Sequence, residues 1–181
     1  MSVVSPFDLL FSIAERSQQL NVALPPRENA RTHWNGLGFS LLGQRYVVPM
    51  SEIGELLRVP PTTKLPGVKP YVLGVANVRG RLLVVVDVAV LIGEASQLAR
   101  AQRRILAMET TDQYFGFLVD ESLGMQHFPS EAFSATVEGA DPKLAPFLNG
   151  CYSLGGAVWP VFSLAKLAEH PALEKLAATA A

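Results

Sequence analysis

The sequence has little cysteine and no excess of charge of either sign, and these shortages exclude several classes of protein. Cys151 is the only cysteine in 181 residues, so no internal disulfide can form, and no Cys/His spacing is typical of zinc. The 15 Lys and Arg residues are balanced by 16 Asp and Glu residues, whereas a nucleic-acid binder usually carries a basic excess. The tightest basic cluster, Arg100, Arg103 and Arg104, is interpreted as a solvated approach to a strand. We therefore expect no nucleic-acid partner.

Long hydrophobic runs are also missing. The longest apolar stretch runs from Leu82 to Ile92 and is interrupted by Asp87, which is far short of the roughly 20 residues that a membrane helix needs. The N-terminus, Met-Ser-Val-Val-Ser-Pro, lacks the basic segment that opens a secretory signal. We expect a cytoplasmic protein without direct membrane insertion. Hydrophobic residues make up 49% of the chain and charged residues 17%, so there is enough apolar material for a true core.

The sequence contains no motif that meets the requirements of an active site. The three histidines are widely separated, and none has a Cys or His at metal-ligand spacing. There is neither a Gly-x-Ser-x-Gly elbow nor a phosphate-binding loop. The acidic pair Asp120–Glu121 has no third polar partner close in sequence, and Cys151 lies in an apolar run where a buried, inert thiol is expected. We expect no enzyme, no cofactor and no bound metal.

The N-terminal residues predict a helix. Ser5 is a suitable N-cap, Pro6 fits the first helical position, and Asp8 stands where a capping box places its acid. Apolar residues then recur at helical spacing over about four turns, until the segment 21–26 ends the pattern. We expect the helix to pack on the following domain, joined to it by a linker over residues 25–35. A role at a membrane surface is less favoured because the polar face is not basic.

The rest of the chain has the texture of a β protein. Short apolar and alternating runs, separated by turn residues, predict four strand pairs. The pairs are 39–42 with 46–50, 71–78 with 82–88, 104–109 with 114–120, and 148–154 with 157–162, and the first pair turns at Gly43-Gln44. Short helices are expected at 88–92 and 164–168, and the proline-marked stretch 60–67 is expected to be a loop.

The β-rich part repeats itself. An offset of 76 residues places Gly74 over Gly150, and an offset of 69 residues places Tyr46 over Phe115, with apolar positions matching around both pairs. The second unit therefore carries seven extra residues between Pro129 and Gly150. We expect two units, each a strand pair, a proline-marked loop and a second strand pair, that form small closed barrels.

The repeat also explains an acid inside an apolar run. Asp87 ends one strand before a short helix, and its repeat partner Ser163 ends the corresponding strand before the other short helix. Both residue types are preferred N-caps, and capping needs only the local backbone. We therefore interpret Asp87 as a cap rather than as a catalytic acid.

Two features are not explained by the fold alone. The turn Asn77-Val78-Arg79-Gly80 needs its Asn and Gly but not its arginine, and position 79 falls on Gly155 in the second unit. This asymmetry favours a binding role for Arg79 over an arginine kept for solubility. The second feature is Ile53 beside Glu52 at a strand end, which is either a contact patch or a core residue.

The stretch Val72–Gly80, continued by Val85–Val88 and Leu91–Gly93, resembles the signature region of the CheW family of chemotaxis coupling proteins. The resemblance covers about residues 36–168 and includes the second-unit pattern Phe115–Asp120. The N-terminal helix and the stretches 74–81 and 124–129 resemble the PilI-like branch of this family, which serves type IV pilus twitching motility.

The resemblance implies a mainly β, CheW-like fold of two SH3-like five-stranded barrels with an N-terminal helical extension. It divides the chain into an extension and linker over 1–33, a CheW-like domain over 34–170 and a tail over 171–181. It implies a non-enzymatic signalling adaptor without cofactors. The implied partners are the regulatory domain of a CheA-type histidine kinase and the cytoplasmic tip of a methyl-accepting chemoreceptor, in membrane-associated arrays.

The resemblance also implies roles for individual residues. Glu52 and Ile53 match the kinase-facing surface of the family, and Val59 is a further kinase-facing candidate. Met50 falls near the receptor-facing groove between the barrels. The coupling turn contributes Asn77, Arg79 and Gly80. The alternatives are a general flagellar chemotaxis coupler, a purely structural assembly module and, from another class, a small-barrel ligand-binding domain.

Overall fold

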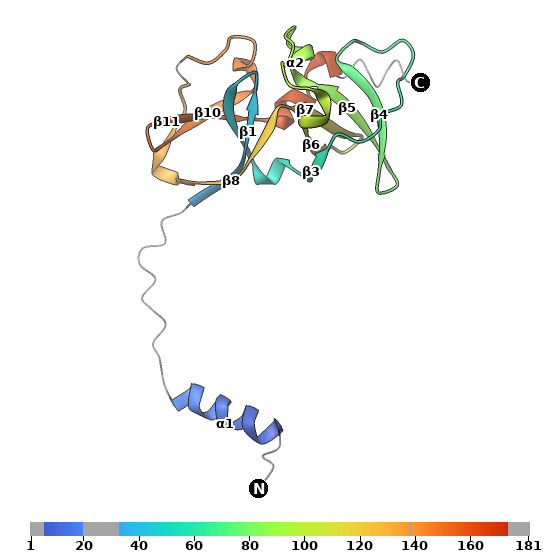
Figure 1. Ribbon diagram of the computed structural model, residues 1–181. Helices are drawn as coiled ribbons and strands as arrows, with labels where there is room; N and C mark the ends of the chain where they lie inside the picture. The colour runs from blue at the N-terminus through green and yellow to red at the C-terminus, as the bar shows by residue number, and fades with distance from the viewer. Residues whose placement is uncertain (1–5, 20–32, 138, 174–181) are drawn as a thin grey trace. The chain divides into compact units, whose positions relative to one another are not determined.

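The computed structural model describes residues 6–19, 33–137 and 139–173. The chain divides into two compact units, Met1–Arg31 and Thr32–Ala181, and each is considered by itself. The first contains α1 (Pro6–Gln19), which confirms the expected helix (Figure 1). The expected cap Ser5 and most of the expected linker lie outside the described residues, and the packing of α1 on the domain that follows stays a prediction. Residues 33–35, expected in the linker, instead begin the first strand.

The second unit is built from two sheets, which curl into barrels (Figure 1). Barrel A has the strand order β8-β1-β2-β11-β10-β9, and barrel B has the order β3-β6-β7-β5-β4, so one barrel has six strands rather than the expected five. The strands of barrel A are β1 (His33–Leu41), β2 (Gln44–Pro49), β8 (Glu121–Pro129), β9 (Phe133–Ser134), β10 (Leu148–Leu154) and β11 (Ala157–Phe162). Those of barrel B are β3 (Glu55–Arg58), β4 (Val72–Val78), β5 (Arg81–Asp87), β6 (Arg104–Glu109) and β7 (Tyr114–Val119).

Short helices join these strands. Two are α-helices, α2 (Val88–Leu91) and α3 (Leu164–Ala168), at the positions that the sequence predicts. The remaining turns of helix are 3₁₀: η1 (Met50–Glu52), η2 (Arg100–Gln102), η3 (Ser130–Ala132) and η4 (Ala145–Phe147). No helix in the described part of the chain is long and apolar enough to cross a bilayer.

The two repeat units are not the two barrels. Barrel B is continuous in sequence from Glu55 to Val119, and barrel A is built from the segments on either side of it. The expectation that each unit closes its own barrel is therefore corrected. The reason lies in two parallel strand pairings, which a tight turn cannot make and which need strands from distant parts of the chain. In barrel A, Val47 lies opposite Val161, and in barrel B, Gly116 lies opposite Val85. These are repeat-equivalent positions, so the same contact is made twice.

Two glycines confirm the alignment of the repeat. Gly74 and Gly150 are repeat partners, and their φ angles of +131° and +121° are both in the region that L side chains rarely adopt. A Cβ atom would lie 2.1 Å from the Thr63 carbonyl oxygen at the first and 2.5 Å from the Ser134 carbonyl oxygen at the second. At both places a short segment crosses over the glycine and pairs with the strand that contains this glycine, β4 in barrel B and β10 in barrel A.

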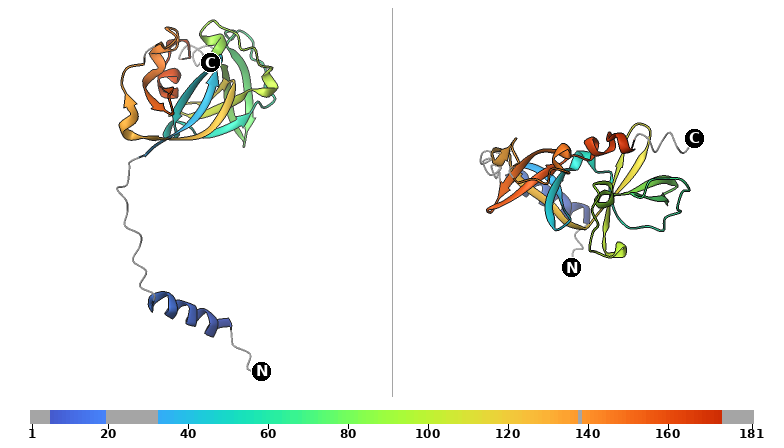
Figure 2. Two further views of the ribbon diagram at one scale, coloured as in Figure 1. Left: turned by 60° about the vertical axis from the view of Figure 1, so that its left-hand side comes forward. Right: turned by 90° about the horizontal axis from the view of Figure 1, so that it is seen from above.

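Three apolar clusters form the core. One fills each barrel, and the largest contains residues of both barrels and of α3. In the view from above in Figure 2, α3 lies between the two barrels. On β2, for example, Val47 points into barrel A whereas Tyr46 and Val48 point into this shared core, so the strand is buried on both faces. The buried residues of the shared core are Leu37, Phe39, Leu41, Tyr46, Val48, Val86, Val88, Ala89, Leu106, Met108, Phe115, Phe117, Val119, Leu144, Phe147, Phe162, Leu164, Leu167 and Leu173.

Both predicted helix caps are confirmed. The Asp87 side chain accepts a hydrogen bond from the Ala89 backbone N–H at 3.1 Å, and the Ser163 hydroxyl accepts one from the Lys166 N–H at 3.3 Å. Cys151 is buried, as expected, and its thiol donates to the Thr136 carbonyl.

The interpretation of Arg103 as a solvated residue is wrong, because its side chain is buried in an ionic network. The guanidinium binds both carboxylate oxygens of Asp87, at 2.7 and 3.0 Å, and lies 3.4 Å from the Asp120 carboxylate. Asp120 in turn accepts hydrogen bonds from the Leu42 backbone N–H at 2.7 Å and the Ser96 hydroxyl at 2.5 Å. Since Leu42 lies in the turn between β1 and β2, the network links barrel B to barrel A.

Candidate partner-binding surface

The turn between β4 and β5 consists of two residues, Arg79 and Gly80. Both have positive φ angles, +53° and +80°, and the Asn77 side-chain oxygen accepts a hydrogen bond from the Gly80 N–H at 2.9 Å. A two-residue turn of this hand matches the twist of an antiparallel hairpin. The repeat-equivalent turn uses Gly155 and Gly156 with φ angles of +58° and +78°. Arginine in this conformation is strained by about 1 kcal/mol relative to glycine, so the fold gains nothing from Arg79.

The Arg79 side chain is held by an acid that the sequence reasoning missed. Its Nη2 lies 2.6 Å from Oε1 of Glu55, the first residue of β3, at the opposite edge of the sheet. Arg79 remains 80% exposed while Glu55 is 21% exposed. An exposed ion pair of this kind adds little to folding stability. The pair therefore orients a guanidinium that still faces solvent.

Three neighbours extend this charged surface. Arg81 donates to both carboxylate oxygens of Glu109, at 2.8 and 2.5 Å, and its guanidinium lies 4.6 Å from the centre of the Tyr114 ring. Burial, and next the Glu55 carboxylate, raise the pKa of Tyr114, while Arg81 and Arg79 oppose that shift. We call Glu55, Arg79, Arg81, Glu109 and Tyr114 the turn patch. It offers paired charges around an aromatic ring and no nucleophile or acid–base pair, so it is suited to binding a polar protein surface.

Glu52 has a structural position that the sequence did not predict. Its carboxylate accepts hydrogen bonds from the backbone N–H groups of Leu164 and Ala165, at 2.5 and 3.2 Å, and from the Ser163 hydroxyl at 3.1 Å. These groups form the N-terminus of α3, where a negative charge is favoured. The acid thus ties the segment after β2 to α3. A kinase-facing role for Glu52 stays a prediction, and any such role has to be compatible with these bonds.

Three further expected site residues, Ile53, Val59 and Met50, differ in how far they are exposed. Ile53 packs against the shared core and Val59 against the core of barrel B, so neither is a freely exposed apolar residue. Met50 is 39% exposed, but it belongs to η1 and not to the end of a strand as expected. The strand ends at Pro49, whose ring fixes φ and removes a backbone donor. Glu55, two residues beyond Ile53, connects this group in sequence to the turn patch.

Comparisons with known proteins match most of the chain to one domain family. A family model described as CheW-like domain matches residues 35–172. The chain is similar to Protein PilI of Pseudomonas aeruginosa, with 44% identity over 168 residues, which are 93% of this chain and 94% of that protein. It is also similar to the chemotaxis protein CheW of Helicobacter pylori, with 29% identity over 84 residues, 46% of this chain and 51% of that one.

A solved structure shares the fold. The crystal structure of the scaffolding protein TtCheW from Thermoanaerobacter tengcongensis matches with a TM-score of 0.63 and 20% identity, over 72% of this chain and 89% of that chain. The similarity to PilI extends beyond the CheW-like domain. It leaves only 13 of the 181 residues unmatched, whereas 34 residues precede the domain, so it includes part of the N-terminal segment.

Proposed function

Because this chain belongs to the CheW-like family, we propose that it is a non-enzymatic adaptor that couples a chemoreceptor to a CheA-type histidine kinase. The proposal extends to the chemosensory system that controls type IV pilus twitching motility and to a cytoplasmic location beside receptor arrays. The single observation that carries it is the turn patch. An arginine is kept in a strained backbone conformation and oriented by Glu55, at a position where the repeat partner is glycine.

The proposed mechanism involves contacts only. The turn patch, together with Asn77 and Gly80 from the turn that holds Arg79, couples the receptor to the kinase. The segment with Glu52, Ile53 and Val59 faces the kinase regulatory domain. In this proposal exposed Met50 contributes to a groove between the barrels, and that groove receives the receptor helix tip. A reversible contact of this sort needs an interface of only modest area. The signal passes as a change in the arrangement of partners, without phosphate on this chain.

The substitution Arg79→Gly tests the proposal with little risk to the fold. Glycine at this φ is unstrained, and Gly155 already serves the same turn in barrel A. We expect a thermal stability equal to or above that of the native chain, together with a loss of receptor-controlled kinase activity in a reconstituted mixture of receptor, kinase and adaptor. The control is Arg58→Ala, which removes an exposed arginine from β3 of the same barrel.

Full kinase control by the Arg79→Gly variant would contradict the proposed role of the turn patch. A matching loss in the Arg58→Ala variant would mean that net charge, and not the oriented guanidinium, is what the partner senses. The pilus system is favoured over a flagellar one by the extent of similarity, since the PilI relative is matched over 94% of its length and the Helicobacter CheW over 51%. Binding to receptor tips of both systems, measured side by side, distinguishes them.

A further inference from the structure

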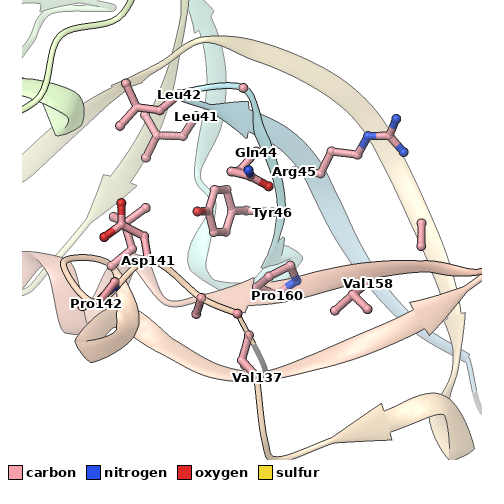
Figure 3. Close-up of a pocket in the computed structure, with 15 residues that line it drawn as sticks. Leu41, Leu42, Gln44, Arg45, Tyr46, Val137, Asp141, Pro142, Val158 and Pro160 are labelled. Carbon is pink, nitrogen blue, oxygen red and sulfur yellow. The ribbon is translucent and has the colours of Figure 1, made fainter.

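A pocket lies on barrel A, away from the turn patch. It has a volume of about 770 Å³ and is lined by the β1–β2 turn, by β11 and by residues from the segment 137–144 (Figure 3). That segment falls within the stretch where the second repeat unit is seven residues longer than the first. The pocket is thus bordered by a piece of chain that the repeated fold does not need.

The hydroxyl of a buried tyrosine opens into this pocket. Tyr46 is 4% exposed, and its hydroxyl has no hydrogen-bond partner within the described ranges. Its repeat partner Phe115 is also 4% exposed and fills the equivalent place without a hydroxyl. The Tyr46 oxygen itself is reached by solvent, because no fully buried side-chain oxygen or nitrogen in the described part of the chain lacks a hydrogen-bond partner. The packing of the ring does not need the hydroxyl, as Phe115 shows, and the hydroxyl is available to a group that enters the pocket.

A carboxylate lies on the same side of the pocket as this hydroxyl. Figure 3 shows Asp141, from the longer segment, with its carboxylate on the side toward which the Tyr46 hydroxyl points. Burial, and next the charge of Asp141, raise the pKa of Tyr46 to about 12. One oxygen of Asp141 accepts a hydrogen bond from the Lys143 backbone N–H at 2.9 Å, and no ion pair to this carboxylate is formed by the residues that the structure describes.

The nearby cations are engaged elsewhere. The Lys143 ammonium pairs with Glu94, and the Arg45 guanidinium lies 6.0 Å from the centre of the Trp159 ring. In Figure 3 the Arg45 side chain extends away from Asp141. Glu94 first, and then the charge of Asp141, raise the pKa of the Lys143 ammonium, so Lys143 balances part of the Asp141 charge without forming an ion pair with it.

The other walls of the pocket are largely apolar, with contributions from Val137, Pro142, Val158 and Pro160. Such walls suit an aliphatic stem, while a carboxylate and a hydroxyl suit a cationic head. We propose that this pocket binds a lysine or arginine side chain presented by a partner protein, with the cation between Asp141 and the Tyr46 hydroxyl. The inference rests on the pocket alone and does not depend on the coupling role of the turn patch.

The test measures binding of small probes to the full chain by NMR titration. The probes are N-acetyl-lysine methylamide, N-acetyl-arginine methylamide, the neutral N-acetyl-norleucine methylamide, and cadaverine as a free amine. Asp141→Asn removes the charge but keeps an oxygen for the Lys143 N–H, and Tyr46→Phe copies the residue found at position 115. The control variant is Asp112→Asn, at an exposed acid on the equivalent turn of barrel B.

We expect the lysine or the arginine probe to bind saturably and the norleucine probe not to bind. Each pocket variant should weaken that binding about tenfold, because each removes one interaction with a charged group, and the control should leave it unchanged. Equal binding of the norleucine probe, or unchanged binding by the Asp141→Asn variant, would overturn the proposal. Saturation by cadaverine without binding of either amino-acid probe would overturn it in favour of a free-amine site.

Discussion

Removing the buried guanidinium of Arg103 should destabilise the whole domain. Arg103 is 4% exposed and is the only cation that pairs with Asp87 and Asp120 in the described structure, so Arg103→Met leaves two carboxylates in the interior without their counter-charge. Breaking a buried pair in this way costs roughly 3–5 kcal/mol. For a domain of this size the loss corresponds to a fall in Tm on the order of 10 °C.

Urea unfolding measures this loss with two separate signals. Trp34 and Trp159 both lie in barrel A, so their fluorescence follows that barrel, whereas far-UV circular dichroism follows both barrels. Because the network ties the Leu42 N–H of barrel A to Asp120, we expect the two transitions to coincide in the native chain and to separate in the Arg103→Met variant.

A second substitution shows whether charge or packing is responsible. Adding Asp87→Ser to Arg103→Met installs the capping residue that α3 already uses, Ser163, and removes one of the two stranded charges. We expect it to restore at least about 1 kcal/mol. The control is Arg100→Met at an exposed position, which should change stability by less than about 0.5 kcal/mol. Equal stabilities for Arg103→Met and Arg100→Met would refute the reasoning.

Two further predictions concern stability. Glu52→Ala should lower the free energy of unfolding in urea by about 1–3 kcal/mol, because it leaves the first N–H groups of α3 without their acceptor. Glu121→Ala, at the exposed repeat-equivalent acid, should have almost no effect. Equal effects of the two substitutions would contradict the proposed tie to α3. Gly74→Ala and Gly150→Ala should each prevent native folding, measured as loss of the native circular dichroism spectrum, because the added carbon would meet a backbone oxygen. Gly43→Ala, at positive φ with open space around it, should fold with a loss of about 1 kcal/mol in stability. Native-like melting of either of the first two variants would contradict the close approach.

The local elements could be predicted from the sequence because their signals are local. The cap at Asp87, the turn at Arg79–Gly80 and the N-terminal helix each depend on residues within one or two turns of chain. The repeat could also be predicted, because matching positions keep their spacing within each of two separate blocks. The need for glycine at positions 74 and 150 could not be predicted, because it depends on the positive φ angles that both residues have in the structure.

The candidate site was only partly predictable, because its contacts join distant parts of the chain. Arg79 was found through its asymmetry with Gly155, whereas its partner Glu55 lies 24 residues earlier on another strand and carries no local sign of that contact. Arg103 was interpreted as solvated for the same reason, because Asp87 and Asp120, which pair with its guanidinium, lie in other parts of the chain. Glu52 was assigned to the surface because the approach of α3, more than 100 residues later, cannot be read from its neighbours.

The continuity of barrel B has a consequence for how the chain folds during synthesis. All five of its strands have been made once Val119 has emerged, so this barrel can close while the rest of the chain is still being translated. The β1–β2 hairpin is the first strand pair to be made, but its partner strand β11 comes more than 100 residues after it. During that interval the side of β2 that later pairs with β11 is an open edge, which is the most aggregation-prone surface of a nascent β protein. The barrel that carries the turn patch can therefore form before the barrel with the longer segment has all of its strands.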